Sequence, residues 1–362
     1  MSTLSFPVEH SRRADLPVDP RPAPLRSTAA GQDPLELIDK LEVIRQEMAD
    51  DIAVIESLLT GIAHGRSVAH QSARHLLAAE GKRLRPMCVA LASRIGTGFG
   101  ENARKVAAAV ELVHNATLLH DDVVDLGELR RGTPTARMIW GNAASIYGGD
   151  LLLVEALELI RETGLVDLID HVLSVIRQMV VAEALQLGRR GKVDADEATY
   201  FAVIEGKTAA LFRAALFSGA RAGGVDEQVA RALEAYGQDL GLAFQIVDDV
   251  LDIAGDPAVT GKALFTDLRE GKMTYPLLLA LARDPALRPL LEGIAANLDV
   301  PVDTETARAV QRSVLQTHAV EDSLARARAY AESAVAQLDA VPACWAKEAL
   351  ETVAWASLAR SK

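Results

Sequence analysis

Apolar residues recur every three or four positions along most of the chain after residue 34. The first run consists of Leu37, Leu41, Ile44, Met48, Ile52, Ile55 and Leu59. This spacing places the apolar side chains on one face of a helix. Pro34 follows Asp33, which is the pattern of an N-cap residue with proline at the first helical position. We therefore expect a long amphipathic helix that begins at Pro34.

The same periodicity continues to the end of the chain. It covers residues 101–125, 166–190, 198–223, 227–255, 274–283 and 323–341. Alanine and leucine dominate these segments, and alternation of β-branched residues, which would indicate strands, is absent. Glycine-containing turns separate the segments, but no linker or low-complexity stretch interrupts them. The pattern predicts an all-α fold without strands, formed by a single large helical domain over residues 34–362.

Residues 1–33 differ from the rest, because they hold five of the 14 prolines and no apolar stretch of the targeting kind. We expect them to form a disordered N-terminal arm. The net charge of −12 argues against a nucleic-acid partner, which needs a basic face. No apolar run reaches the roughly 18 residues of a transmembrane segment. Cys88 and Cys344 are too few for a disulfide framework, so we expect buried thiols in a reducing, cytoplasmic protein.

Two stretches carry three aspartates each at the end of an apolar helical run. The first set is Asp121, Asp122 and Asp125, and the second is Asp248, Asp249 and Asp252. Both have the spacing i, i+1, i+4, which brings like charges together on one helix face and destabilises the helix. One such set is usually a solvated helix end. Two copies, each on a strongly apolar helix, are poorly explained in that way.

Bound cations would offset this repulsion. Hard cations such as Mg²⁺ prefer oxygen ligands, keep several waters, and are commonly shared between protein carboxylates and substrate phosphates. Two facing aspartate clusters are therefore expected to hold a small group of Mg²⁺ ions. The coordination sites that remain would be taken by a polyanion.

Basic residues cluster near helix ends, where a polyanion would need them. They are Lys82, Arg83 and Arg85, then Arg130 and Arg131, then Lys207, and finally Lys262, Arg269 and Lys272. Arginine binds phosphate in a forked, bidentate manner, and lysine acts as a point charge. Any one cluster alone would be a solvated surface patch. In combination with two aspartate triplets, the clusters indicate a diphosphate site.

These stretches closely resemble the motifs of the trans-isoprenyl diphosphate synthases, also called polyprenyl diphosphate synthases. The matching stretches are GKRLRP, ELVHNATLLHDD, LLHDDVVDLGELRRGTPTA, GNAASIYGGD, EGKTAALF, FQIVDDVLDIAGD and GKALFTDLREGKMTYP. The likeness runs in order from about residue 35 to the C-terminus. It implies an isoprenoid synthase fold, all-α with a deep central cavity, in a homodimer. It also implies a prenyltransferase that joins an allylic diphosphate head to tail to isopentenyl diphosphate.

The resemblance also implies roles for individual residues. The main Mg²⁺ ligands are expected to be Asp121, Asp125 and Asp248, supported directly or through water by Asp122, Asp249 and Asp252, with three ions when substrate is bound. The allylic diphosphate would be held by Arg130, Lys207, Thr208, Gln245 and Lys262, with Lys272 nearby. The catalytic residues among them would be Arg130, Lys207, Thr208 and Gln245. The metal-free isopentenyl diphosphate would be held by Lys82, Arg85, His114 and Arg131.

His114 also has an ordinary explanation, since a single histidine on an apolar helix is usually a core residue. It stands seven residues before Asp121, about two turns along nearly the same helix face. That position, together with the resemblance, favours a contact with the ligand. His120 has no such support, and we expect it to be structural.

The length of the product is expected to depend on residues that precede Asp121. In the family, bulky aromatics four or five positions before the first aspartate stop growth at short products. Here those positions hold Thr117 and Ala116, and aromatic residues make up only 4% of the chain. The next layer would hold Val113, with Leu153 and Leu157 from another helix facing the tunnel. We expect products of geranylgeranyl to octaprenyl length.

Three other interpretations remain open. A class I terpene cyclase shares the fold and the ionisation chemistry, but it usually replaces the second aspartate triplet and needs no second diphosphate site. A regulatory subunit of a heteromeric synthase would typically lack aspartates, whereas this chain keeps all six. A plain helical scaffold would leave those aspartates unexplained.

Overall fold

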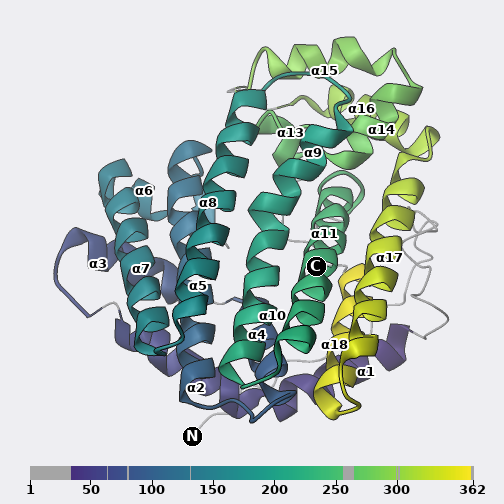
Figure 1. Ribbon diagram of the computed structural model, residues 1–362. Helices are drawn as coiled ribbons and strands as arrows, with labels where there is room; N and C mark the ends of the chain where they lie inside the picture. The colour runs from purple at the N-terminus through teal and green to yellow at the C-terminus, as the bar shows by residue number, and fades with distance from the viewer. Residues whose placement is uncertain are drawn as a thin grey trace, which may run out of the picture.

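Long helices standing side by side make up most of the molecule (Figure 1). The computed structural model describes residues 34–62, 64–79, 81–130, 132–255, 265–298, 300 and 302–359. The longest helices are α5 (Glu101–Val124), α7 (Asn142–Glu162), α8 (Val166–Arg189), α11 (Glu227–Ala254) and α17 (Ala319–Gln337). The prediction of an all-α fold is confirmed.

Shorter helices close the ends and sides of this bundle. They are α3 (Val68–Leu77), α4 (Leu84–Arg94), α6 (Ala136–Trp140), α9 (Glu197–Ile204), α10 (Ala210–Ala222), α13 (Thr266–Arg269), α14 (Tyr275–Arg283), α15 (Leu287–Ala295), α16 (Thr304–Gln316) and α18 (Trp345–Leu358). A π-helical segment, η3 (Glu205–Ala209), joins α9 to α10, and a 3₁₀ turn, η4 (Leu338–Ala340), follows α17. Helices α13 to α16 gather at one end of the long helices (Figure 1).

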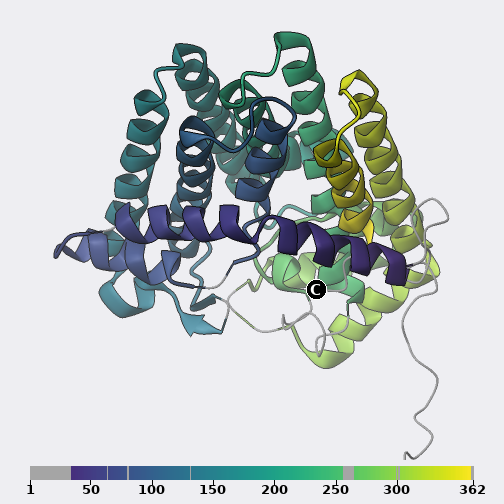
Figure 2. The same cartoon turned by 90° about the horizontal axis from the view of Figure 1, so that it is seen from below.

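The first predicted helix is present but divided into α1 (Pro34–Glu47) and α2 (Ala49–Ile62). The division falls at Met48, a fully buried residue. Hydrogen bonds from Met48 N to Ile44 O and from Ile52 N to Met48 O still connect the two parts. Together they run across the end of the bundle (Figure 2). The proposed N-cap, Asp33, and the predicted arm of residues 1–33 lie outside the described residues.

Glycines allow two helix pairs near the candidate site to approach closely. A Cβ atom at Gly149 of α7 would lie 3.0 Å from the carbonyl oxygen of Ala116 on α5. A Cβ atom at Gly241 of α11 would lie 2.4 Å from the Cα atom of Ala209 in η3. The distance at Gly241 is too short for any side chain, and the distance at Gly149 is at the limit of a real contact. The second pair places the start of α10 directly against the helix that carries the second aspartate triplet.

Apolar residues from the long helices form the main core. Its largest fully buried side chains include Leu112 of α5, Leu152 of α7, Phe212 of α10 and Tyr236 of α11. A second apolar cluster, which includes Val250, Leu277, Leu291 and Val310, lies beneath α13 to α16. The periodic apolar residues of α5 and α11 are therefore buried. Each of these two helices carries its aspartate triplet at its C-terminal end.

One small feature departs from the predicted absence of strands. Two two-residue strands, β1 (Leu129–Arg130) and β2 (Thr133–Pro134), pair antiparallel directly after α5. Gly132 adopts a φ of 79° between them. Residues this few carry no detectable strand periodicity, so the pattern showed only a turn here.

None of the helices in the described residues is apolar over enough of its length to cross a membrane. Cys88 is fully buried, Cys344 is partly exposed, and both are free thiols.

Candidate functional site

The two aspartate triplets lie at the C-terminal ends of α5 and α11. Asp121 and Asp122 are in the last turn of α5, and Asp125 caps the helix through a hydrogen bond from its N–H to the carbonyl of Asp121. Asp248, Asp249 and Asp252 occupy the last two turns of α11. The partners of five of these carboxylates, those of Asp121, Asp122, Asp125, Asp249 and Asp252, differ from one to the next.

Two lysines hold the outer carboxylates of the first triplet. Lys207 Nζ lies 3.8 Å from Asp121 Oδ2, and Lys272 Nζ lies 3.0 Å from Asp125 Oδ2. The side chains of both aspartates remain 20% exposed. Both carboxylates are therefore partly open to solvent, and each is paired with a lysine from a distant segment of the chain.

Asp122 points elsewhere. Its carboxylate is almost fully buried, accepts a hydrogen bond from Arg130 Nε at 2.9 Å, and forms an ion pair with Arg130 Nη2 at 2.8 Å. Arg130 belongs to β1, so this pair fastens the small hairpin to the end of α5. The structure thus brings together two predicted site residues, one expected near metal and one expected on the allylic diphosphate.

The π-helical segment η3 connects the two triplets. Its Lys207 faces Asp121, while the next residue, Thr208, donates a hydrogen bond to Gln245 Oε1 of α11 at 2.7 Å. A π-helical turn shifts the register of neighbouring side chains and is often found at functional sites. Within this segment Lys207 contacts α5 and Thr208 contacts α11.

Asp249 is fixed by two neutral donors. Gln245 Nε2 donates to Asp249 Oδ1 at 2.8 Å, and the Tyr200 hydroxyl donates to Oδ2 at 2.7 Å. Because the amide nitrogen of Gln245 is held by Asp249, its oxygen points toward Thr208. Asp249 therefore orients Gln245.

Asp252 holds the segment that follows α11 in space. Its carboxylate accepts backbone hydrogen bonds from Thr266 at 3.0 Å and from Asp267 at 3.2 Å. This fixes the start of α13, and α13 leads to Lys272. Asp122, Asp249 and Asp252 are thus each hydrogen-bonded to protein groups that are not lysines.

Burial makes these carboxylates reluctant to carry charge. Burial raises the pKa of Asp121 to about 6, an effect that Lys207 opposes and the nearby Glu183 reinforces. Burial also raises the pKa values of Asp249 and Asp252 to about 8, with the charge of Asp267 adding to both. In all three carboxylates burial is the main cause of the raised pKa, and neighbouring carboxylates add to it.

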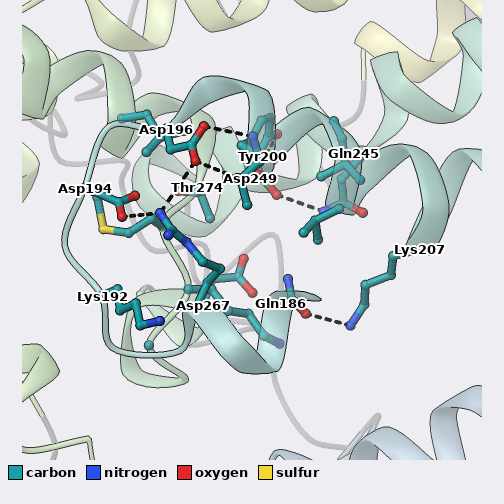
Figure 3. Close-up of a pocket in the computed structure, with 18 of the residues that line it drawn as sticks. Gln186, Lys192, Asp194, Asp196, Tyr200, Lys207, Gln245, Asp249, Asp267 and Thr274 are labelled. Carbon is teal, nitrogen blue, oxygen red and sulfur yellow. Dashed lines mark hydrogen bonds and ion pairs between the residues drawn. The ribbon is translucent and has the colours of Figure 1, made fainter. Parts of the chain in front are cut away.

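A pocket of about 110 Å³ opens beside these groups (Figure 3). Five predicted site residues line it: Lys207, Thr208, Gln245, Asp249 and Lys272. Further polar residues also line it, namely Gln186, Arg189, Lys192, Asp194, Asp196, Thr199, Tyr200, Asp267 and Thr274, and the rest of the lining is Val203, Ile204, Gly271, Met273 and Leu278. Figure 3 shows Lys207 directed toward Gln186 and Asp249 between Tyr200 and Gln245. The lining combines cations with carboxylate, amide and hydroxyl groups, which suits a ligand that carries both anionic oxygens and metal.

The predicted isopentenyl diphosphate residues that the structure describes lie at the start of α4 and on α5. Lys82 is exposed, and Arg85 is half-buried with its guanidinium 4.6 Å from the centre of the Phe212 ring. His114 lies on α5 and is half-buried. Arg83, between the two basic residues, bonds to Glu111, which is three residues before His114. None of Lys82, Arg85 and His114 lines the pocket described above.

The predicted chain-length residues do not line this pocket. Ala116 is fully buried and Val113 is 2% exposed, whereas Thr117, Leu153 and Leu157 are half-buried. Thr117 donates a hydrogen bond to the carbonyl of His114. Two predicted site residues, Arg131 and Lys262, lie outside the described residues.

Several side chains near the site were not singled out from the sequence. Glu183 and Gln186 of α8 contact Lys207 at 2.7 and 3.1 Å, and Glu270 contacts Lys272 at 2.5 Å. Tyr200 reaches Asp249 from α9. The i, i+3 spacing of Glu183 and Gln186 near the end of α8 was the available signal, because it puts two oxygen-bearing side chains on one face.

The donor chemistry of the site fits Mg²⁺. The carboxylates of Asp121 and Asp125 are hard oxygen donors, and a divalent cation would stabilise the charged form of Asp121, whose pKa is raised mainly by burial and further by the charges of Glu183 and Asp125. Among the described residues, no three histidine, cysteine, aspartate or glutamate side chains converge to form a complete metal site by themselves.

Comparison with known proteins gives a consistent result. Residues 66–311 match the polyprenyl synthetase family. The chain is 34% identical over 304 residues to heptaprenyl diphosphate synthase component 2 of Geobacillus stearothermophilus, covering 84% of this chain and 93% of that protein. It is 33% identical over 328 residues to octaprenyl diphosphate synthase of Escherichia coli strain K12, covering 89% and 99% of the two chains.

A solved structure agrees with the sequence relatives. It is the crystal structure of a polyprenyl synthase from Caulobacter crescentus CB15 in complex with calcium and isoprenyl diphosphate. The two structures superpose with a TM-score of 0.83 at 37% sequence identity, covering 93% of this chain and 100% of the other.

Proposed function

This chain belongs to the polyprenyl synthetase family, and from that premise we propose that its cavity joins an allylic diphosphate head to tail to isopentenyl diphosphate. One observation carries the proposal. Lys207 and Thr208, adjacent in η3, link the first aspartate triplet to the helix of the second around one pocket. The proposed catalytic domain runs from residue 34 to the C-terminus.

The proposed metal ligands are Asp121, Asp125 and Asp248, with three Mg²⁺ ions when the allylic substrate is bound. When bound, Mg²⁺ would stabilise the negative charge that develops on the leaving diphosphate. Asp122, Asp249 and Asp252 support this arrangement through the groups that they hold in place, namely Arg130, Gln245 and the start of α13.

Cationic side chains bind the leaving diphosphate. Lys207 and Lys272 pair with Asp121 and Asp125, the proposed metal ligands, which places both ammonium groups beside the proposed position of the diphosphate. Arg130 and Lys262 are the other proposed contacts. Because these positive charges are held in position before reaction, they stabilise the departing anion at little reorganisation cost.

The proposed reaction breaks the allylic C–O bond first, and pyrophosphate leaves with the bonding electrons. Thr208 and Gln245 direct oxygen atoms toward the resulting carbocation. The double bond of isopentenyl diphosphate then attacks the cation, forming the new C–C bond. A proton leaves the adjacent carbon for the released pyrophosphate. Apolar walls exclude water, which would otherwise convert the cation to an alcohol.

Isopentenyl diphosphate is proposed to bind without metal at Lys82, Arg85, His114 and Arg131. Its diphosphate would remain bound throughout the reaction, so these residues need only bind and orient it. The growing tail would pass Ala116 and Thr117, whose small side chains give products of geranylgeranyl to octaprenyl length. Val113, Leu153 and Leu157 are the proposed walls below them.

A homodimer completes the proposal. Large apolar side chains are exposed at helical spacing on two helices that pack together: Tyr147 and Val154 on α7, and Leu173, Val180 and Val181 on α8. Monomers rarely leave such surfaces exposed, and a second copy of the chain is the commonest partner. Replacing Val181 by aspartate should shift the mass measured by light scattering from dimer to monomer.

The proposal is tested by the substrates that purified protein requires. The expected result is incorporation of labelled isopentenyl diphosphate that needs both an allylic diphosphate and Mg²⁺ and that stops when the metal is chelated. A terpene cyclase would convert the allylic diphosphate without isopentenyl diphosphate. A regulatory subunit would show no turnover alone.

A further inference from the structure

Arg83 stands between Lys82 and Arg85, but its side chain points into the protein. The side chain is only 4% exposed. Its backbone has a φ of 47°, in the left-handed region that residues other than glycine rarely adopt. Such a conformation persists where the surrounding contacts determine it. The inward-turned Arg83 guanidinium makes contacts that accompany this backbone conformation.

The guanidinium joins three helices. Its Nε and Nη2 atoms lie 2.6 and 3.2 Å from the two carboxylate oxygens of Glu56 on α2. Its Nη1 atom lies 2.7 Å from Glu111 Oε1 on α5. Nη2 also donates to the carbonyl of Leu77, the last residue of α3, at 3.2 Å. Two carboxylates and a carbonyl thus share one planar fork, which a lysine could not reproduce.

These contacts fix the position of the segment that leads into α4. Lys82 precedes Arg83, and Arg85 follows it within the first turn of the helix. Glu111 is itself held, because Asn115 Nδ2 donates to its carbonyl at 2.7 Å and to its Oε1 at 3.3 Å. His114, between Glu111 and Asn115 on α5, lies within the same braced turn.

We propose that Arg83 is a positioning residue of the isopentenyl diphosphate site: it sets the distance between the start of α4, with Lys82 and Arg85, and the turn of α5 that carries His114. This inference rests on the proposed function. Arg83 touches no substrate, since its guanidinium is turned inward and held by Glu56 and Glu111.

A selective effect on isopentenyl diphosphate is expected because this substrate is proposed to bind without metal. Isopentenyl diphosphate would be bound by side chains alone, so its affinity depends on how accurately those side chains are placed. A displacement of about 1 Å can cost on the order of 100-fold in an oriented reaction. Loss of the Arg83 brace is therefore expected to affect this substrate selectively, because Lys207 and Lys272 are held from other elements.

The test compares Arg83→Met with Arg94→Met. Arg94 also lies on α4 and also pairs with α2, through Asp51, but it is at the opposite end of α4. Both variants lose a charged link between the same two helices. Arg83→Lys and Glu111→Gln serve as milder changes, should Arg83→Met fail to fold.

The expected result is a rise of about 10- to 100-fold in the KM for isopentenyl diphosphate in Arg83→Met. Arg83→Lys and Glu111→Gln should show smaller rises, and the KM for the allylic diphosphate should change less than about twofold. Calorimetric titration of isopentenyl diphosphate without metal should show the same weakening. Arg94→Met should lower the unfolding temperature but leave both KM values unchanged.

The inference is overturned if the Arg83 and Glu111 variants lose only stability, as Arg94→Met does, or if both substrates are weakened equally. Failure of the proposed function is a different outcome, because the wild-type protein itself would then incorporate no isopentenyl diphosphate.

Discussion

Lys272 Nζ lies 3.0 Å from Asp125 Oδ2, although the two residues are 147 positions apart in the chain. Lys272 comes from the connection between α13 and α14, and Asp125 caps α5. The pair therefore joins the first aspartate triplet to the segment that Asp252 of the second triplet holds in place. Burial lowers the pKa of Lys272, but Glu270, Asp267 and Asp125 outweigh it and raise the pKa above its ordinary value, so this lysine stays charged.

Replacing Lys272 by glutamine should weaken binding of the allylic diphosphate. One lost hydrogen bond to a charged group is worth roughly 1.5–3 kcal/mol, which corresponds to a rise of about 10- to 100-fold in KM. Lys105→Gln is the control, because Lys105 pairs with Glu101 and Glu162 away from the site. Steady-state kinetics with the allylic substrate varied would give the KM of both variants. An unchanged KM in Lys272→Gln would show that Lys272 does not bind the allylic diphosphate.

Ala116→Phe should shorten the product to farnesyl length, because a ring at this position would obstruct the proposed path of the tail. Ala116 is fully buried, so overpacking is also expected to cost about 1–3 kcal/mol of stability. Ala103→Phe changes an equally buried alanine at the other end of α5 and should destabilise the protein without shortening the product. Chromatography of the dephosphorylated alcohols distinguishes the two effects. An unchanged distribution in Ala116→Phe would exclude it as a channel residue.

His171 should make stability depend on pH. Burial lowers the pKa of His171; Arg213 of α10 and Arg231 of α11 add to this, while Glu234 of α11 and Asp167 of α8 oppose it. The unfolded chain therefore binds a proton more readily than the folded one. The stabilisation is complete above the unfolded pKa of about 6.5 and decreases as the pH falls below it.

The measurement is chemical denaturation of wild type and His171→Gln between neutral and mildly acidic pH. The variant should lose less stability than the wild type over this range. His318→Gln, which alters an exposed histidine, is the control and should follow the wild type. Parallel curves for wild type and His171→Gln would show that another group causes the dependence.

Cys88 should be inert in the folded protein. Burial raises the pKa of its thiol to about 12, although Arg85 lowers it in part. The thiolate is the reactive form, so at mildly alkaline pH Cys88 should react with a thiol reagent only after unfolding. Cys344 is partly exposed and should react in the native state. In Cys344→Ser the native-state reaction should disappear; a fast reaction that remains would show that Cys88 is accessible.

The sequence was sufficient for the features that depend on local periodicity. The apolar spacing predicted α5 and α11 nearly to their ends, since the helix is the conformation that puts those residues on one face. The same spacing predicted that both aspartate triplets would stand at the C-terminal ends of these helices. Charge chemistry then indicated a metal and diphosphate site before any contact was known.

The partners of those aspartates could not be predicted in the same way. Nothing in the spacing of Asp121, Asp122 and Asp125 shows that the middle carboxylate turns toward Arg130 while the others face lysines. The inward turn of Arg83 was likewise hidden, because exposed and buried arginines look alike in a basic run. Both features depend on how separate helices pack against one another. The two-residue strands and the division of the first helix at Met48 were missed for another reason, because they are too short to alter a periodic pattern.

The central claim is that one cavity extends an allylic diphosphate with isopentenyl diphosphate beyond farnesyl length. The most direct measurement is mass spectrometry of the products that the purified wild-type protein forms from farnesyl diphosphate, isopentenyl diphosphate and Mg²⁺. The account predicts prenyl diphosphates of geranylgeranyl length or longer, up to about octaprenyl. Recovery of farnesyl diphosphate without extension would contradict it.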